Sequence, residues 1–106
     1  MTMPQLEVHN PATGALITTL PADDAASVAA RYTAARQAQP VWASRPLAER
    51  KNCIVKFRVA VVAELSELAV VMTRETGKPV TMSRNELNGL LGRIDFFLKE
   101  VDELLE

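Results

Sequence analysis

Residues 47–79 read LAERKNCIVKFRVAVVAELSELAVVMTRETGKP, and this stretch decides the fold of the chain. Its large apolar residues recur at intervals of 7, 3, 4, 4, 3 and 4, at Leu47, Ile54, Phe57, Val61, Leu65, Leu68 and Met72. This spacing predicts the apolar face of a long amphipathic helix. Gly77, Lys78 and Pro79 end it, since glycine adopts the left-handed conformation after a helix, lysine complements the dipole and proline cannot continue.

Two serines predict helix starts in this region. Ser44 is the expected N-cap before the first turn, where Pro46 is tolerated. Ser66 could cap a second helix inside the stretch. We therefore expect two helices in series, near residues 45–63 and 65–76.

The apolar pattern continues downstream. Intervals of 4, 3, 4, 3 and 4 separate Leu87, Leu91, Ile94, Leu98, Val101 and Leu105. They predict a helix near residues 80–105. It begins either with Pro79 as a first helical residue or at a capping box of Ser83 and Glu86.

The flank and the end of this helix carry charge. Asp95 and Lys99 are predicted to form an i,i+4 ion pair. Residues 99–106 hold four acidic side chains and one lysine, although the end of a helix dipole favours positive charge. Because no Gly, Asn or Pro ends this helix either, we expect the sequence to be part of a longer protein.

The N-terminal residues predict a β-hairpin. Leu6 and Val8 alternate with polar neighbours, and the alternation resumes from Leu16. Between them, residues 10–14 read NPATG. Its asparagine can bond the nearby backbone, its proline fixes φ and its glycine tolerates a positive φ, which is typical of a turn.

The segment after the hairpin predicts a helix near residues 24–39. Asp23 and Asp24 supply an N-cap and first-turn acids, both favourable at the start of a helix. Pro40 is expected to end this helix, because proline lacks the backbone donor that a helix interior needs.

The fold class is therefore mainly α with an N-terminal β-hairpin: a hairpin in residues 1–20 and about four helices in residues 21–106. Of the 106 residues, 48% are hydrophobic and 24% are charged, which excludes a disordered tail. Lys and Arg number 12 against 13 Asp and Glu, without a basic run, which argues against nucleic-acid binding.

No membrane span is expected, because the longest apolar run, residues 59–63, is far shorter than the ~20 residues that a spanning helix needs. The single cysteine cannot form an internal disulfide and fits a reducing compartment. We therefore expect a cytoplasmic protein.

Two single residues were candidates for chemistry. Cys53 is the only thiol, but it lies among apolar residues inside the predicted helix, so we expect a small buried or half-buried hydrophobe. His9 borders the hairpin turn without a second histidine or a cluster of carboxylates. Surface or turn packing is therefore expected of it, rather than a metal or catalytic role.

Paired residues add no site. The acidic pairs Asp23–Asp24 and Asp102–Glu103 lie at helix ends, where such groups are solvated, and capping explains the first pair. Gly89 and Gly92 fall within a helical pattern and predict close approach of two helices rather than a phosphate-binding loop. We therefore expect no catalytic, cofactor-binding or metal-binding residue in this sequence.

Four short motifs follow one another along the chain: NPATG at 10–14, PVWA at 40–43, LAER at 47–50 and ETGKP at 75–79. As an ordered set covering about residues 7–98, they resemble the N-terminal region of the NAD(P)-dependent aldehyde dehydrogenase superfamily. The resemblance implies an N-terminal fragment of the α/β fold of these enzymes, packed on their coenzyme-binding domain.

The resemblance also implies oxidation of an aldehyde to a carboxylic acid with NAD or NADP in the full-length protein. In the family, a cysteine thiolate attacks the carbonyl, hydride passes to the nicotinamide and a glutamate-activated water releases the product. The G-Q-x-C and E-L-G-G-K motifs that carry this cysteine and glutamate are absent here, and the surroundings of Cys53 do not match the first of them. The chain alone is therefore expected to bind no coenzyme and to be inactive.

The alternative hypothesis is a stand-alone helical interaction or oligomerisation module without catalytic activity. Under either hypothesis, the apolar face of residues 87–105 needs a partner, either the apolar face of residues 47–72 or a second copy of the chain. We therefore expect a homo-oligomer formed through exposed apolar helix faces.

Overall fold

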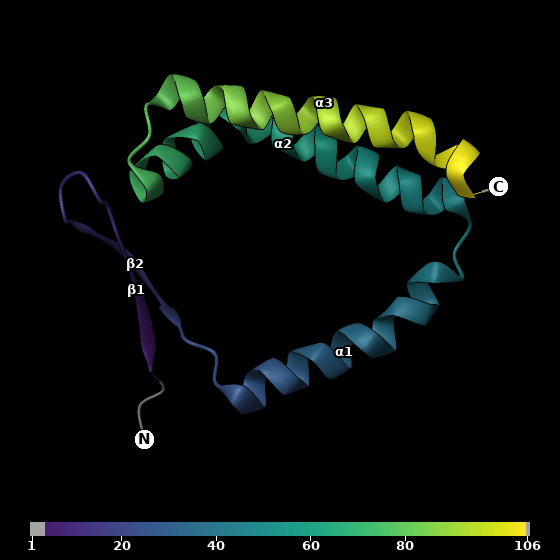
Figure 1. The fold of residues 1–106 in the computed structure, drawn as a ribbon, viewed down its shortest axis with the longest axis horizontal. Coiled ribbons are helices and arrows are strands. Elements are labelled where there is room, and N and C mark those ends of the chain that lie inside the picture. The colour runs from purple at the N-terminus through teal and green to yellow at the C-terminus, as the bar shows by residue number, and fades with distance from the viewer. Residues whose placement is uncertain (1–3, 106) are drawn as a thin grey trace.

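The computed structural model describes residues 4–105 (Figure 1). In chain order, the described elements are β1 (Gln5–His9), β2 (Leu16–Pro21), α1 (Ala25–Ala43), α2 (Leu47–Thr76) and α3 (Val80–Leu105). The predicted fold class, mainly α with an N-terminal β-hairpin, is confirmed for this part of the chain.

Strands β1 and β2 form an antiparallel hairpin in which Leu6 lies opposite Leu20. The turn between them forms as its residue types predict: the Asn10 side chain accepts a hydrogen bond from the Ala12 backbone N–H at 2.9 Å. Gly14 adopts a φ of 76°, which glycine tolerates without a steric cost. A register shift follows Val8, so the hairpin is irregular next to its turn.

Helix α1 starts as predicted. Asp24 is its N-cap and forms a capping box with Ser27: the Asp24 carboxylate accepts from the Ser27 N–H at 2.8 Å, and the Ser27 hydroxyl accepts from the Asp24 N–H at 2.9 Å. These bonds satisfy two backbone donors that the start of a helix otherwise leaves free.

The expectation that Pro40 ends α1 is wrong, because the helix continues to Ala43. Pro40 removes a single backbone donor, and only one further turn follows it. Its own carbonyl accepts from the Ser44 N–H at 3.0 Å. Ser44 is therefore the C-cap of α1 and not the predicted N-cap of the next helix, whose N-cap is Pro46, without a side-chain bond.

The expected break at Ser66 is also wrong, because α2 is one continuous helix. Val61 and Ala69 are buried on either side of Ser66 and pack along α3, so tertiary contact holds the helix together across this position. The helix ends as predicted at Gly77, which has a φ of 79° and donates its N–H to the Thr73 carbonyl at 2.9 Å.

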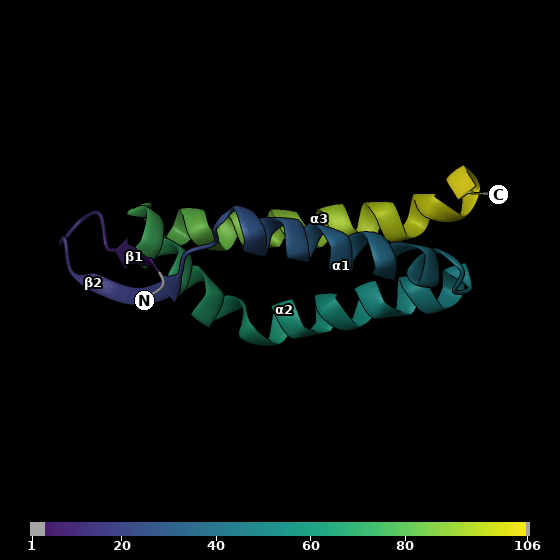
Figure 2. The same ribbon diagram turned by 90° about the horizontal axis from the view of Figure 1, so that it is seen from below.

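Helices α2 and α3 run antiparallel and lie side by side in Figures 1 and 2. The core of the described residues lies between them and consists of Val61, Ala69, Leu87 and Ile94. Helix α3 starts directly after Pro79, the first of the two predicted starts. Ser83 is not a cap: it is fully buried, and its hydroxyl lies 2.8 Å from that of Thr73.

Charged side chains also join the two helices. Arg58 donates two hydrogen bonds to Asp95, from Nε at 2.7 Å and from Nη2 at 2.9 Å, and Lys51 lies 2.8 Å from Asp102. The predicted pair of Asp95 with Lys99 does not form. The bidentate geometry that arginine offers across the interface occupies the Asp95 carboxylate instead.

The described residues form an open shape, in which α1 and the strands of the hairpin extend away from the α2–α3 pair (Figure 1). The radius of gyration is 18.1 Å, whereas a compact domain of this length has about 13 Å. Large apolar side chains are correspondingly exposed, among them Tyr32, Phe57 and Leu104 at 67%, 52% and 74%. The α2–α3 pair therefore buries one face of each helix, and other apolar surfaces remain uncovered.

We predict that Ser83→Ala lowers the free energy of unfolding of the helix pair by about 1 kcal/mol, because the Thr73 hydroxyl loses its hydrogen-bond partner. Urea unfolding followed by far-UV circular dichroism measures this change. Removing both hydroxyls in Thr73→Val/Ser83→Ala should recover most of the loss, since no polar group is then left without its partner. Additive losses in the double variant would contradict the assignment.

Candidate functional site

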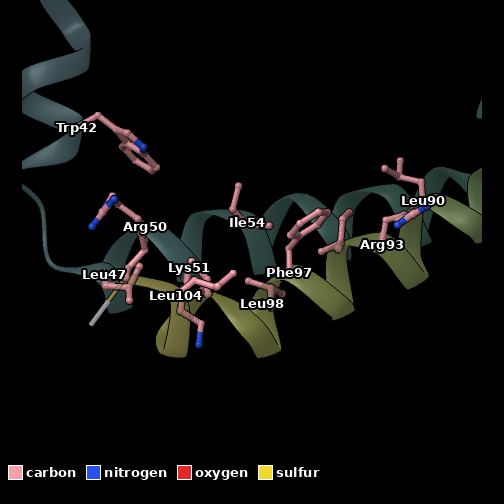
Figure 3. Close-up of a pocket in the computed structure, with 13 residues that line it drawn as sticks. Trp42, Leu47, Arg50, Lys51, Ile54, Leu90, Arg93, Phe97, Leu98 and Leu104 are labelled. Atoms are coloured by element: carbon pink, nitrogen blue, oxygen red, sulfur yellow. The ribbon is translucent and has the colours of Figure 1, made fainter.

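An apolar groove of about 520 Å³ lies at the end of the α2–α3 pair that is nearest to the end of α1 (Figure 3). Its walls come from three helices, with Trp42 in α1, Ile54 in α2 and Phe97 in α3. The full lining is Trp42, Leu47, Arg50, Lys51, Ile54, Leu90, Arg93, Ile94, Phe97, Leu98, Val101, Leu104 and Leu105.

The groove exists because the apolar faces of α2 and α3 extend beyond the part that the two helices bury against each other. Ile94 is buried, whereas Ile54 and Phe97 are 41% and 58% exposed. The sequence analysis identified both apolar faces but not the groove. Arg50, Lys51 and Arg93 stand among the apolar residues of the two faces, but only the packing of the helices brings them to one groove.

Three cations line the groove, namely Arg50, Lys51 and Arg93. Lys51 is paired with Asp102, and Arg50 donates from Nε to the Arg45 carbonyl at 3.1 Å. The Arg45 guanidinium lies 6.0 Å from the centre of the Trp42 ring, within the range of a cation–π contact. Arg93 also contributes its positive charge to the lining.

Apart from its cations, the groove is lined by apolar side chains. Among the described residues that line it, none is Asp, Glu, His, Ser or Cys. Lys51 is the lining residue of a type that acts in acid–base or nucleophilic catalysis, and it is ion-paired with Asp102. The apolar lining fits contact with another apolar surface.

Cys53 is exposed, so the prediction of a buried or half-buried residue is wrong. Lys51 and Arg58 reach α3 from α2, and Cys53, two residues after Lys51, falls on a different face of the helix. Among the described residues, no base is hydrogen-bonded to the thiol. The structure therefore gives Cys53 no activated environment.

His9 packs against the turn at the surface, as predicted. Its Nε2 lies 3.0 Å from the Glu7 carboxylate and its Nδ1 lies 3.3 Å from the Gly14 carbonyl oxygen. Only the protonated ring can donate from both nitrogens. The hydrogen bond to Glu7, followed by that to Gly14, accordingly raises the pKa of His9 above its usual value.

The two acidic pairs have structural roles, one at the start of α1 and one between α2 and α3. Asp24 caps α1, and Asp23 accepts hydrogen bonds from Ser27 at 2.9 Å and Arg31 at 3.1 Å, which lower its pKa in that order. Asp102 is paired across the helix interface. Capping, as predicted, explains the first pair.

The predicted close approach of two helices at Gly89 and Gly92 is wrong. A Cβ built on either glycine would meet nothing within 4 Å, because both positions face away from α2. Within residues 4–105, no group of His, Cys, Asp or Glu side chains is arranged to hold a metal ion. None of the three helices described is long and apolar enough to cross a membrane.

A family model described as the aldehyde dehydrogenase family matches residues 2–106. The chain is 33% identical over 99 residues to N-succinylglutamate 5-semialdehyde dehydrogenase of Novosphingobium aromaticivorans, a match of 93% of this chain and 20% of that protein. It is 33% identical over 103 residues to N-succinylglutamate 5-semialdehyde dehydrogenase 1 of Caulobacter vibrioides, which covers 97% of this chain and 22% of that protein.

A third relative is the N-succinylglutamate 5-semialdehyde dehydrogenase of Chromobacterium violaceum. It is 38% identical over 94 residues, or 89% of this chain and 19% of that protein. The chain thus spans about a fifth of the length of these curated relatives.

We predict that His9 titrates with a pKa above the usual value of about 6.5. Its contribution to hairpin stability is then complete below that usual value and is lost as the pH rises through the raised pKa. Glu7→Gln should lower the pKa of His9, because the charged acceptor is lost. NMR titration of the His9 ring measures its pKa in the wild-type chain and in Glu7→Gln. Glu49→Gln in α2 is the control and should leave the pKa of His9 unchanged. A usual pKa in the wild-type chain would show that the two ring contacts do not persist.

Proposed function

Because the chain belongs to the aldehyde dehydrogenase family, we propose that it is the N-terminal portion of an NAD(P)-dependent aldehyde dehydrogenase. The complete enzyme oxidises an aldehyde to a carboxylic acid. The observation that carries this proposal is the family match over residues 2–106. The chain spans about a fifth of the length of its relatives, which leaves most of their sequence outside it. In this proposal the chain supplies scaffold, and the reacting groups belong to the rest of the enzyme.

The uncovered apolar surfaces support this assignment. A groove of about 520 Å³ and exposed side chains such as Tyr32 and Phe97 are costly to leave in water. Relatives about five times as long provide enough polypeptide to cover them. We propose that the hairpin of residues 1–20 and the helical segment of residues 21–106 pack on the coenzyme-binding domain of the longer enzyme, which fills the groove.

The described residues do not fit a dinucleotide. Their only sheet is a two-stranded antiparallel hairpin, whereas dinucleotide sites of the doubly wound kind need parallel strands and a glycine-rich turn before a helix. Among the described residues, the lining of the groove likewise includes no Asp, Glu, His, Ser or Cys. We therefore propose that NAD or NADP binds to the rest of the enzyme and that the 106-residue chain alone is inactive.

The relatives suggest the first substrate to test. Several are named for N-succinylglutamate 5-semialdehyde, and we propose this aldehyde, or another carboxylated semialdehyde, as the substrate of the complete enzyme. For the compartment we propose the cytoplasm, which agrees with a single cysteine that has no partner for an internal disulfide.

The proposal is tested on the gene and on the protein. Reading the frame beyond Glu106 should reveal downstream G-Q-x-C and E-L-G-G-K motifs, and the longer product should reduce NAD or NADP with N-succinylglutamate 5-semialdehyde. The purified 106-residue chain should produce no NADH or NADPH under the same conditions. A stop codon directly after Glu106 in the native gene would overturn the proposal and favour the stand-alone module, and turnover by the short chain would contradict the assignment of the chemistry to other segments.

We further predict that the separate 106-residue chain self-associates, because its exposed apolar helix faces find one another when the rest of the enzyme is missing. Light scattering should give a mass above that of the monomer. Phe97→Glu, which places a charge in the groove, should shift the distribution toward the monomer, whereas Asn52→Glu at an exposed polar position of α2 should not. A monomeric mass at high concentration, without binding of an apolar dye, would contradict this prediction.

A further inference from the structure

Two connections that lie far apart in the sequence meet in the structure. The hairpin turn of residues 10–14 lies beside the connection between α2 and α3 (Figure 1). A Cβ built on Gly77 would lie 3.1 Å from Cγ of Pro11 and 3.9 Å from its Cβ. The Pro11 ring would therefore have to give way by a few tenths of an ångström to a side chain at position 77, and the Gly77 backbone packs directly on this ring.

Gly77 satisfies two separate requirements. Its φ of 79° ends α2 in the left-handed conformation, with its N–H donated to the Thr73 carbonyl. Gly14 has a similar φ of 76°, yet nothing lies within 4 Å of the position of its Cβ. A left-handed glycine therefore does not imply a close neighbour, and the contact with Pro11 is a second constraint on Gly77.

Both sides of the contact are held in place by their own local bonds. In the turn, the Asn10 carbonyl accepts from the Gly14 N–H at 2.7 Å, and the ring of Pro11 fixes its own φ. In the connection, Lys78 is paired with Glu86 of α3. Little conformational entropy remains to be lost when two such ordered segments meet.

We propose that the Pro11–Gly77 contact positions the N-terminal hairpin on the α2–α3 pair. Within the described residues, the strands contact each other extensively, as do α2 and α3, but neither strand packs extensively on a helix. Along the chain, the hairpin is joined to the helix pair through α1. A contact between the turn and the connection therefore sets its orientation, independently of the enzymatic function proposed above.

The first test removes the ring and measures the distant glycine. Pro11→Ala keeps a residue that can adopt the turn but deletes Cγ, and it should change the amide chemical shifts of Gly77 and Lys78. Pro21→Ala, at the other end of the hairpin, is the matched control and should leave these shifts unchanged. In the wild-type chain, nuclear Overhauser effects should join the Pro11 ring protons to the Gly77 α-protons.

The second test is a double-mutant cycle read by the thermal midpoint of the helices. Gly77→Ala adds backbone strain and a tight contact with Pro11. In the Pro11→Ala background only the strain remains, and it should lower the thermal midpoint by about 4–8 °C. The loss in the wild-type background should be about twice as large. Gly92→Ala, where a Cβ meets open space, should have the same effect in both backgrounds.

Unchanged shifts of Gly77 in Pro11→Ala, together with equal losses from Gly77→Ala in the two backgrounds, would overturn the proposal. Gly77 would then act only as the cap of α2. Because the shift measurement needs only Pro11→Ala, the proposal stays testable even if Gly77→Ala does not fold.

Discussion

The side chains buried between α2 and α3 are the interaction on which the other elements depend. Burial there removes Val61 and Ala69 of α2 and Leu87 and Ile94 of α3 from water. Each large apolar side chain so buried stabilises the fold by about 1.5–3 kcal/mol. The antiparallel direction follows from the short connection at Gly77, and the bidentate bond of Arg58 to Asp95 favours one register of the two helices. The groove lies mainly on this helix pair, and the hairpin turn contacts the connection between its two helices. The positions of the groove and of the turn contact therefore depend on how α2 and α3 pack.

Patterns that depend on local chemistry could be predicted from the sequence. The turn of residues 10–14, the Asp24 cap and the end of α2 at Gly77 form as expected, because each is determined by residues within a few positions of it. Predictions that depended on partners elsewhere were less successful. Ser66 does not interrupt α2, since buried residues on both sides of it pack on α3, and Asp95 binds Arg58 across the interface in preference to a neighbour on its own helix.

The same limit explains the candidate site. The apolar faces of both helices were visible in the spacing of residues, but the groove arises where the two faces diverge, and only the angle and register of packing determine that place. Exposure of Cys53 likewise depends on which face of α2 meets α3, and its apolar neighbours in the sequence do not decide this. A list of residue types could therefore not show the groove.

The open shape of the described residues is consistent with membership of an enzyme family. In an enzyme, the segments that hold the fold together need not be the segments that carry the reacting groups. Residues that hold a fold together can identify a family while none of them touches a reacting atom, because function resides in sites added to a fold. Here the family motifs at residues 10–14 and 75–79 coincide with the turn and the connection that meet at Pro11 and Gly77. The structure thus explains one residue in each motif: Pro11 contacts the Gly77 backbone, and Gly77 has no side chain to crowd the Pro11 ring. In this part of the chain, the two motifs therefore mark a packing arrangement between the hairpin turn and the α2–α3 connection.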